Sequence, residues 1–354
     1  MAALVDAIST AHLDGLLVTN LANIRYLTGF SGTSALLLVA RSNVVLITDF
    51  RYQTQAADEV GSAARVLIEP QSLWAGLRRV LPEVDALVVL GFESANLLHR
   101  DFQRLLDSGA RWQWRPTADL VEALRERKDA DEVELIARAA GVATRALERL
   151  LPQVRAGMTE VETAGVLEKA LRDEGSEGFP FPSIVASGPR AALPHARSSH
   201  RAIEEGDFLL LDFGAEVGGY CADLTRTVVV GKASAEQRQV YDVVRRANEI
   251  AVSAIRPGMR GRDADALARD YIERCGFGEE FGHSLGHGLG LEVHEAPRLA
   301  RSADGVLAEG SVVTIEPGIY RAGWGGVRIE DDVHLTSGGP ELLTHFTREL
   351  IEVG

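Results

Sequence analysis

Four acidic residues in the C-terminal half of the chain adjoin short apolar runs that predict β-strands. Asp212 ends one run and Asp223, after a turn-like segment at 214–220, opens the next; Glu316 and Glu330 close two later runs. The first pair alone fits turn caps at least as well as a site. Four like charges that converge, however, would repel one another strongly unless cations lay between them. We therefore expect divalent metal ions here, and Mn²⁺, Co²⁺, Fe²⁺ and Zn²⁺ all suit such ligands.

An internal repeat supports this convergence. VRAGM at 154–158 returns as IRPGM at 255–259, and EGDFLLLDFG at 205–214 returns as EGSVVTIEPG at 309–318, about 100 residues later. A duplicated fold commonly places its cleft between the halves, so the equivalent positions Asp212 and Glu316 are expected to face each other. Two metal ions about 3.5–4 Å apart, bridged by carboxylates and a water, form a hydrolytic centre.

Four of the nine histidines lie in segments that can reach such a centre. His283 and His287 belong to the glycine-rich segment HSLGHGLG, whose backbone can approach a ligand closely. His294 follows in the segment VHE, and His195 lies in the loop PHA. Any single histidine is more commonly a structural or surface residue. We assign that role to the other five, which are His12, His99, His200, His334 and His345.

The elements that must position these residues fall into two domains. Residues 1–120 alternate short apolar strands with helices and predict a small α/β domain, in which no GxGxxG pattern supports dinucleotide binding. Residues 121–354 open with a long amphipathic helix over 131–151, for which Asp129 and Glu132 form a capping box. Two copies of paired helices followed by strands come next, which predicts an α+β fold with helices packed on one face of a sheet.

The composition excludes several classes of protein. A length of 354 residues suggests about two domains. The net charge of −14 argues against a general nucleic-acid binder. No apolar stretch approaches the ~20 residues of a membrane span, and the first residues lack the pattern of a secretory signal. The two cysteines are too few for a disulfide framework, so a reducing cytoplasm fits best.

The segments around these residues resemble a known family. LLLDFG, YCADLTRT, GHSLGHGLGLEVHE, TIEPGIY and VRIED are similar to the pita-bread metallopeptidases, and specifically to their proline-specific branch, Xaa-Pro dipeptidase (prolidase) and aminopeptidase P. NIRYLTGFSGTSA and TDFRY resemble the creatinase-like N-terminal domain of that branch. The resemblance covers nearly the whole chain. It implies an α+β pita-bread catalytic domain after a smaller α/β creatinase-like domain, and a homodimer.

The resemblance also implies a role for each matching residue. The family's two divalent ions, Mn²⁺, Co²⁺ or Zn²⁺, would be held by five ligands, of which the second and fifth bridge both: Asp212, Asp223, His287, Glu316 and Glu330. Glu316 is also the expected proton-transfer group. The family's other active-site residues correspond to His195, His283, His294 and Arg328.

The implied substrates are small peptides with proline in second position. A dipeptidase must bind a free carboxylate directly after the proline ring, which favours an arginine. Arg298, Arg25 and Arg51 are candidates, and Arg41 is a further one, although each singly fits an ordinary surface arginine. The compact N-terminal region favours a prolidase.

Several alternatives share part of this pattern. Aminopeptidase P acts on longer peptides with every one of the same catalytic residues. Methionine aminopeptidase has the same ligands, but the extra N-terminal domain and the HEAP and VRIED segments argue against it. A non-catalytic binding protein or a creatinase would lack the ligand set that this sequence keeps.

Overall fold

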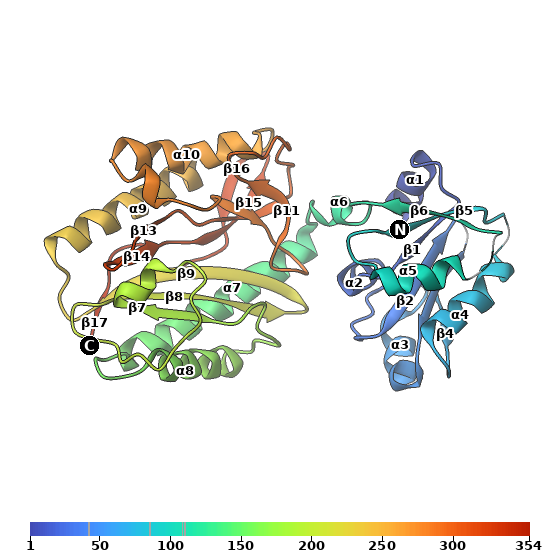
Figure 1. The fold of residues 1–354 in the computed structure, drawn as a ribbon, viewed down its shortest axis with the longest axis horizontal. Helices are drawn as coiled ribbons and strands as arrows, with labels where there is room; N and C mark the ends of the chain where they lie inside the picture. Colours follow the sequence, from blue (N-terminus) through green and yellow to red (C-terminus); the bar gives the residue numbers. More distant parts are fainter. Residues whose placement is uncertain (42, 85, 108, 110) are drawn as a thin grey trace. The chain divides into compact units, whose positions relative to one another are not determined.

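The computed structural model describes every residue of the chain except Ser42, Asp85, Ser108 and Ala110. It divides into two compact units, Met1–Arg125 and Glu126–Gly354 (Figure 1). Within the described residues, no helix combines the length and the apolar character needed to cross a membrane.

The N-terminal unit is built on a six-stranded sheet with the order β4-β3-β2-β1-β5-β6. Its central strands are apolar on both faces: Leu37 and Val39 pack into one hydrophobic cluster, and Leu36 and Leu38 into another. Helices cover both faces, which explains why the run at 35–40 has no polar alternation. The strands are β1 (Gly15–Val18), β2 (Ala35–Ala40), β3 (Asn43–Thr48), β4 (Arg65–Ile68), β5 (Val89–Glu93) and β6 (Gln113–Thr117). The helices are α1 (Ala2–Thr10), α2 (Leu21–Thr28), α3 (Gln53–Val60), α4 (Leu73–Val80), α5 (His99–Leu106) and α6 (Glu122–Arg125), with 3₁₀ turns η1 (Phe50–Tyr52) and η2 (Leu81–Glu83).

The C-terminal unit places two helix pairs on opposite sides of its strands (Figure 1). The helices are α7 (Ala130–Leu150), α8 (Glu160–Asp173), α9 (Ala235–Ala254) and α10 (Gly261–Arg274), and the 3₁₀ turns are η3 (Leu151–Gln153), η4 (Gly188–Ala192) and η5 (Gly278–Glu280). One sheet has the order β17-β9-β8-β7, a second has the order β11-β10-β12-β15-β16, and β13 pairs with β14. The strands are β7 (Ile184–Ser187), β8 (Phe208–Val217), β9 (Tyr220–Val230), β10 (Gly286–Gly288), β11 (Glu295–Leu299), β12 (Val312–Ile315), β13 (Gly318–Arg321), β14 (Gly325–Arg328), β15 (Asp331–Thr336), β16 (Gly339–Leu342) and β17 (Glu352–Val353).

The two helix pairs bury separate cores. Side chains of α7 and α8 pack with β8 and β9 in one cluster, and those of α9 and α10 pack with β12 and β15 in the other. This duplication follows the repeat in the sequence. The long helix predicted at 131–151 is α7, and its capping box of Asp129 and Glu132 is present.

The hairpin of β8 and β9 is longer than predicted. The segment 214–220 was expected to be the turn, but the strands continue to Val217 and resume at Tyr220. Gly218 and Gly219 make the reversal, with φ of 59° and 78°. Two successive residues with positive φ suit the tight hairpin turns whose twist matches the strands, so two residues suffice. As a result Asp212 lies inside a strand rather than at its end.

Candidate metal centre

The β8–β9 hairpin brings the first two acidic residues to one face of the sheet. Asp212 lies opposite Thr225, and Asp223 lies opposite Gly214. Because residues two apart on a strand share a face, both carboxylates project from the same side. Both side chains are buried.

The second repeat supplies the remaining groups of the cluster. Glu316 directly follows β12, and His287 lies in β10, with its Nε2 3.5 Å from Glu316 Oε1 and 3.8 Å from Asp223 Oδ2. Single ligand atoms of Asp223, His287 and Glu330 lie within 4.8 Å of one another. Arg328 Nη2 contacts Asp212 Oδ2. The structure thus brings the five predicted ligands together, with Asp212, Asp223 and Glu330 buried and His287 and Glu316 half-buried.

The electrostatics of this cluster fit a cation. Burial raises the pKa of Asp223 and of Glu316 well above their usual values, and the charges of the neighbouring carboxylates raise them further. Burial, with the charge of Asp212, raises the pKa of Glu330 to about 8. Asp223 Oδ1 has no hydrogen-bond partner among the residues that the structure describes. Divalent cations would relieve the repulsion and occupy the unpartnered oxygen.

The two histidines nearest the cluster are held in the neutral form that a ligand or a hydrogen-bonding group needs. Burial is the main cause that lowers the pKa of His287 to about 4. The charge of His294, whose ring centroid is 4.4 Å away, is the second cause. His287 Nδ1 lies 3.1 Å from Gly288 O. A proton on Nδ1 therefore donates to this carbonyl and leaves Nε2 available for a cation. Burial, followed by the charge of Arg328, lowers the pKa of His283 to about 4.

The remaining predicted residues line the same region. The charge of His195 contributes to the lowered pKa of His283 and of His294. Burial is the larger cause at both residues. His195 itself lies on an exposed loop. Arg328 is buried and donates from Nη1 to Tyr320 Oη at 2.7 Å.

Sequence reasoning missed three residues that hold this site together. Tyr320 Oη lies 2.9 Å from His283 Nε2 and so links that histidine to Arg328. Thr225 Oγ1 donates to Glu330 Oε2 at 2.6 Å. Asp332 is buried, and its Oδ2 accepts the backbone N–H of Asp223 at 3.1 Å. A period of two along the strands, from Asp223 to Thr225 and from Glu330 to Asp332, is a signal that could have found two of them.

The three substrate arginines have different settings. Arg298 lies opposite His287 in the pairing of β10 with β11, and its side chain is exposed. Arg25 and Arg51 belong to the N-terminal unit, where Arg51 pairs with Asp49 at 2.7 Å. Their part in substrate binding stays a prediction.

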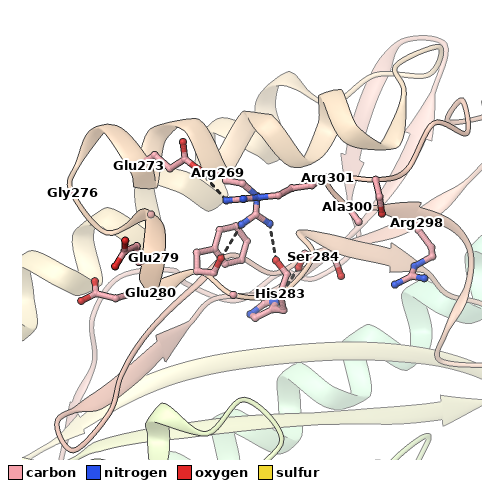
Figure 2. Close-up of a pocket in the computed structure, with 14 residues that line it drawn as sticks. Arg269, Glu273, Gly276, Glu279, Glu280, His283, Ser284, Arg298, Ala300 and Arg301 are labelled. Carbon is pink, nitrogen blue, oxygen red and sulfur yellow. Dashed lines mark hydrogen bonds and ion pairs between the residues drawn. The ribbon is translucent and has the colours of Figure 1, made fainter.

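A cavity of about 990 Å³ lies beside His283 (Figure 2). Figure 2 shows Arg298 at one end and Glu279 and Glu280 at the other, with His283 and Ser284 between them. Arg301 on the rim pairs with Glu273 at 3.0 Å. The cavity is therefore polar, and it contains both a cationic end and an acidic end within reach of a group bound at His283.

The chain is similar to characterised families along its whole length. Residues 134–337 match metallopeptidase family M24, and residues 1–127 match the creatinase/prolidase N-terminal domain. The Xaa-Pro dipeptidase of Pyrococcus horikoshii is 33% identical over 350 residues, which cover 98% of this chain and 97% of that protein.

Solved structures give the same result. An Xaa-Pro dipeptidase from Bacillus anthracis is 41% identical, with a TM-score of 0.96 over 99% of this chain and 98% of that one. An X-Pro aminopeptidase from Thermotoga maritima is 38% identical, with a TM-score of 0.92 over 99% and 98% of the two chains. The expected creatinase-like domain followed by a pita-bread domain is confirmed. The chain belongs to metallopeptidase family M24.

Proposed function

We propose that this protein hydrolyses the bond between the first residue and the proline of Xaa-Pro dipeptides. The observation that carries the proposal is the convergence of Asp223, His287 and Glu330 ligand atoms within 4.8 Å, in a chain that matches an Xaa-Pro dipeptidase over 98% of its length. The shared family supports metal-dependent hydrolysis. The names of the relatives support the Xaa-Pro specificity.

The metal centre is proposed to hold two divalent ions, Mn²⁺, Co²⁺ or Zn²⁺. Its ligands would be Asp212, Asp223, His287, Glu316 and Glu330, with Asp223 and Glu330 shared between the ions. When bound, such ions lower the pKa of a water molecule and polarise a carbonyl group.

The surrounding side chains would position the substrate and move the proton. Within the described part of the chain, the Glu316 carboxylate accepts one long hydrogen bond, from Thr314 Oγ1 at 3.4 Å, so it would be free to accept a proton and return it to the leaving nitrogen. The pKa values of His283 and His294 are both lowered, chiefly through burial. His294, as a neutral ring, would donate a hydrogen bond to the carbonyl oxygen as negative charge develops on it. The single N–H of neutral His283 donates from Nδ1 to Ser284 O, and its Nε2 accepts from Tyr320 Oη, so this ring would line the site rather than donate to the substrate. Arg328 would hold Asp212 in place through its contact with Oδ2.

Arg298 is the proposed partner of the substrate's free carboxylate. Its position opposite His287 in the pairing of β10 with β11 supports this choice, and an arginine can pair with a carboxylate through two parallel hydrogen bonds. Arg25 and Arg51 are alternatives from the N-terminal unit. We further propose a homodimer that works in the cytoplasm, for which the family resemblance and the two free cysteines, Cys221 and Cys275, are the support.

Aminopeptidase P activity on longer peptides is the second candidate. The cavity of about 990 Å³ extends from His283 and Arg298, and sites of 300–1,000 Å³ hold ligands larger than a dipeptide. The T. maritima relative named an X-Pro aminopeptidase is also similar over the full chain.

The deciding experiment compares an Xaa-Pro dipeptide with the matching Xaa-Pro tripeptide. The protein is stripped of metal and reloaded in turn with Mn²⁺, Co²⁺ and Zn²⁺, and hydrolysis is followed for each. Metal-dependent cleavage of the dipeptide, with little of the tripeptide, supports a prolidase; preference for the tripeptide supports aminopeptidase P. Cleavage of neither substrate would overturn the proposal, and a methionyl peptide in the same assay tests methionine aminopeptidase.

A further inference from the structure

The position of the His195 side chain is set by the backbone of its loop, because the imidazole ring itself is not anchored. His195 is exposed, and its imidazole makes no hydrogen bond within the part of the chain that the structure describes. The hydrogen bonds on either side of it belong to the backbone: Ala196 N donates to Leu193 O at 3.1 Å, and Arg328 Nη1 donates to Pro194 O at 3.5 Å. The direction in which the ring points therefore depends on the backbone of the loop.

A buried carboxylate holds both ends of this loop. Glu160 is the first residue of α8 and its relative exposure is 0%. Its Oε1 accepts from Ser187 N at 2.8 Å and Ser187 Oγ at 2.9 Å, before the loop. Its Oε2 accepts from Ser199 N at 2.9 Å and Ser199 Oγ at 2.7 Å, after the loop.

Arg190 completes the closure. Its Nε donates to both oxygens of Glu160, at 3.2 and 3.0 Å. Its Nη2 donates to Arg197 O at 2.5 Å and so crosses the loop on the far side of His195. The start of α8 adds a further tie, because Val161 N donates to Ser199 O at 3.1 Å.

From this geometry we infer that Glu160 is a positioning residue that acts through His195. One carboxylate ties Ser187 to Ser199 and orients Arg190, so the span between them has its two ends clamped together. A misplacement of about 1 Å at a reacting group can cost roughly 100-fold in rate. The inference rests on the proposed function, because it assumes that His195 faces the substrate.

The test is a double-mutant cycle on the metal-loaded enzyme. Glu160→Gln keeps the shape of the side chain but points an amide N–H₂ at groups that are themselves donors. We expect kcat/KM for the Xaa-Pro dipeptide to fall about 10- to 100-fold in the wild-type background. In a His195→Ala background the same substitution should cost less than about twofold, because the group it positions is gone.

The neighbouring Glu162 gives a matched control. It lies in the same helical turn, is exposed, and caps α8 through Thr159 N and Thr159 Oγ1 without touching the loop. Glu162→Gln should leave kcat/KM within about twofold of wild type. Equal losses from Glu160→Gln with and without His195 would overturn the inference, because they would indicate a general structural role.

Two further readouts keep the test decisive. Hydrogen exchange of the Ser187 and Ser199 amides should accelerate in Glu160→Gln while metal affinity stays unchanged; unchanged exchange would overturn the inference. If Glu160→Gln does not fold, Ser199→Ala removes one donor to Glu160, together with the 3.2 Å hydrogen bond from Arg201 N to Ser199 Oγ, and should lower kcat/KM about fivefold, again only when His195 is present. Absence of hydrolysis by the unmodified enzyme would instead count against the proposed function.

Discussion

Glu160 and the acidic cluster are two regions of one unit that bury carboxylates in opposite ways. Glu160 is 0% exposed and Glu330 is 2% exposed, so both have left water. Glu160 accepts from five donor groups on three residues. The carboxylate of Glu330 accepts, among the described residues, from Thr225 alone. The number of donors, and not burial, therefore distinguishes Glu160 from Glu330, which we propose as a cation ligand.

The pKa values follow the same division. Burial raises the pKa of Glu160, but hydrogen bonds from Ser199, Ser187 and Arg190 outweigh it and bring the pKa below its usual 4.5. Burial, together with the charge of Asp212, raises the pKa of Glu330 to about 8. A buried carboxylate that few donors stabilise favours either a proton or a cation, which supports the proposed metal centre, whereas the donors around Glu160 stabilise its charge directly.

The largest expected effect is the loss of a shared ligand. Asp223→Ala should lower activity on the dipeptide by more than roughly 1,000-fold, because a metal centre contributes several kcal/mol to transition-state stabilisation. Metal content, measured by elemental analysis after dialysis, should fall with it. A variant that keeps its full metal content would break the comparison, since Asp223 would then not be a cation ligand.

The second-largest effect is expected at Arg298, the proposed partner of the substrate's free carboxylate. Arg298→Ala should raise KM for the dipeptide about 10- to 100-fold, because hydrogen bonds to charged groups contribute about 1.5–3 kcal/mol. KM for the tripeptide should change less, since its carboxylate lies one residue farther away. Equal changes in both values, measured by steady-state kinetics, would move the assignment to Arg25 or Arg51.

In the metal-free protein, replacing Glu330 and replacing Glu160 should change the unfolding temperature in opposite directions. Glu330→Gln removes a carboxyl group that must either take up a proton on folding near neutral pH or repel its neighbours, and should raise the unfolding temperature. Glu160→Gln breaks satisfied hydrogen bonds and should lower it. A difference of about 2 kcal/mol for either change corresponds to roughly 5 °C. Calorimetry of both variants after chelation measures this, and shifts of the same sign would contradict the distinction.

Acid should remove the stability that Glu160 contributes. Because its folded-state pKa lies below 4.5, the contribution is present above that pH and is lost as the pH falls through the folded-state value. The difference in unfolding temperature between wild type and Glu160→Gln should therefore be largest near neutral pH and shrink below about pH 4.5. If the difference in unfolding temperature grew in acid instead, the folded-state pKa of Glu160 would be raised and not lowered.

The smallest effect is expected in the other unit of the chain. His12 is exposed and lies in the N-terminal unit. His12→Ala should leave kcat/KM unchanged and alter stability by less than about 0.5 kcal/mol. A large catalytic loss would show that the histidines were sorted wrongly.

Residue types and spacing carried most of the description of the metal centre. Periodicity and capping chemistry are local, and α7 with its capping box at Asp129 accordingly lies within one residue of the prediction. The repeat in the sequence paired Asp212 with Glu316 because equivalent positions of a duplicated fold meet at its centre. The flanking segments then indicated the family, which the comparisons confirmed.

Only the tertiary structure determined which hydrogen-bond donors each carboxylate receives. The sequence places Glu160 in a helix start like many others, and nothing local shows that Ser187 and Ser199 reach it from 27 and 39 residues away. The link from Arg328 through Tyr320 to His283 likewise depends on which strands pair. Hydrogen-bond partners distant in the chain are set by packing and register, so a carboxylate's role becomes visible only when its donors are counted in three dimensions.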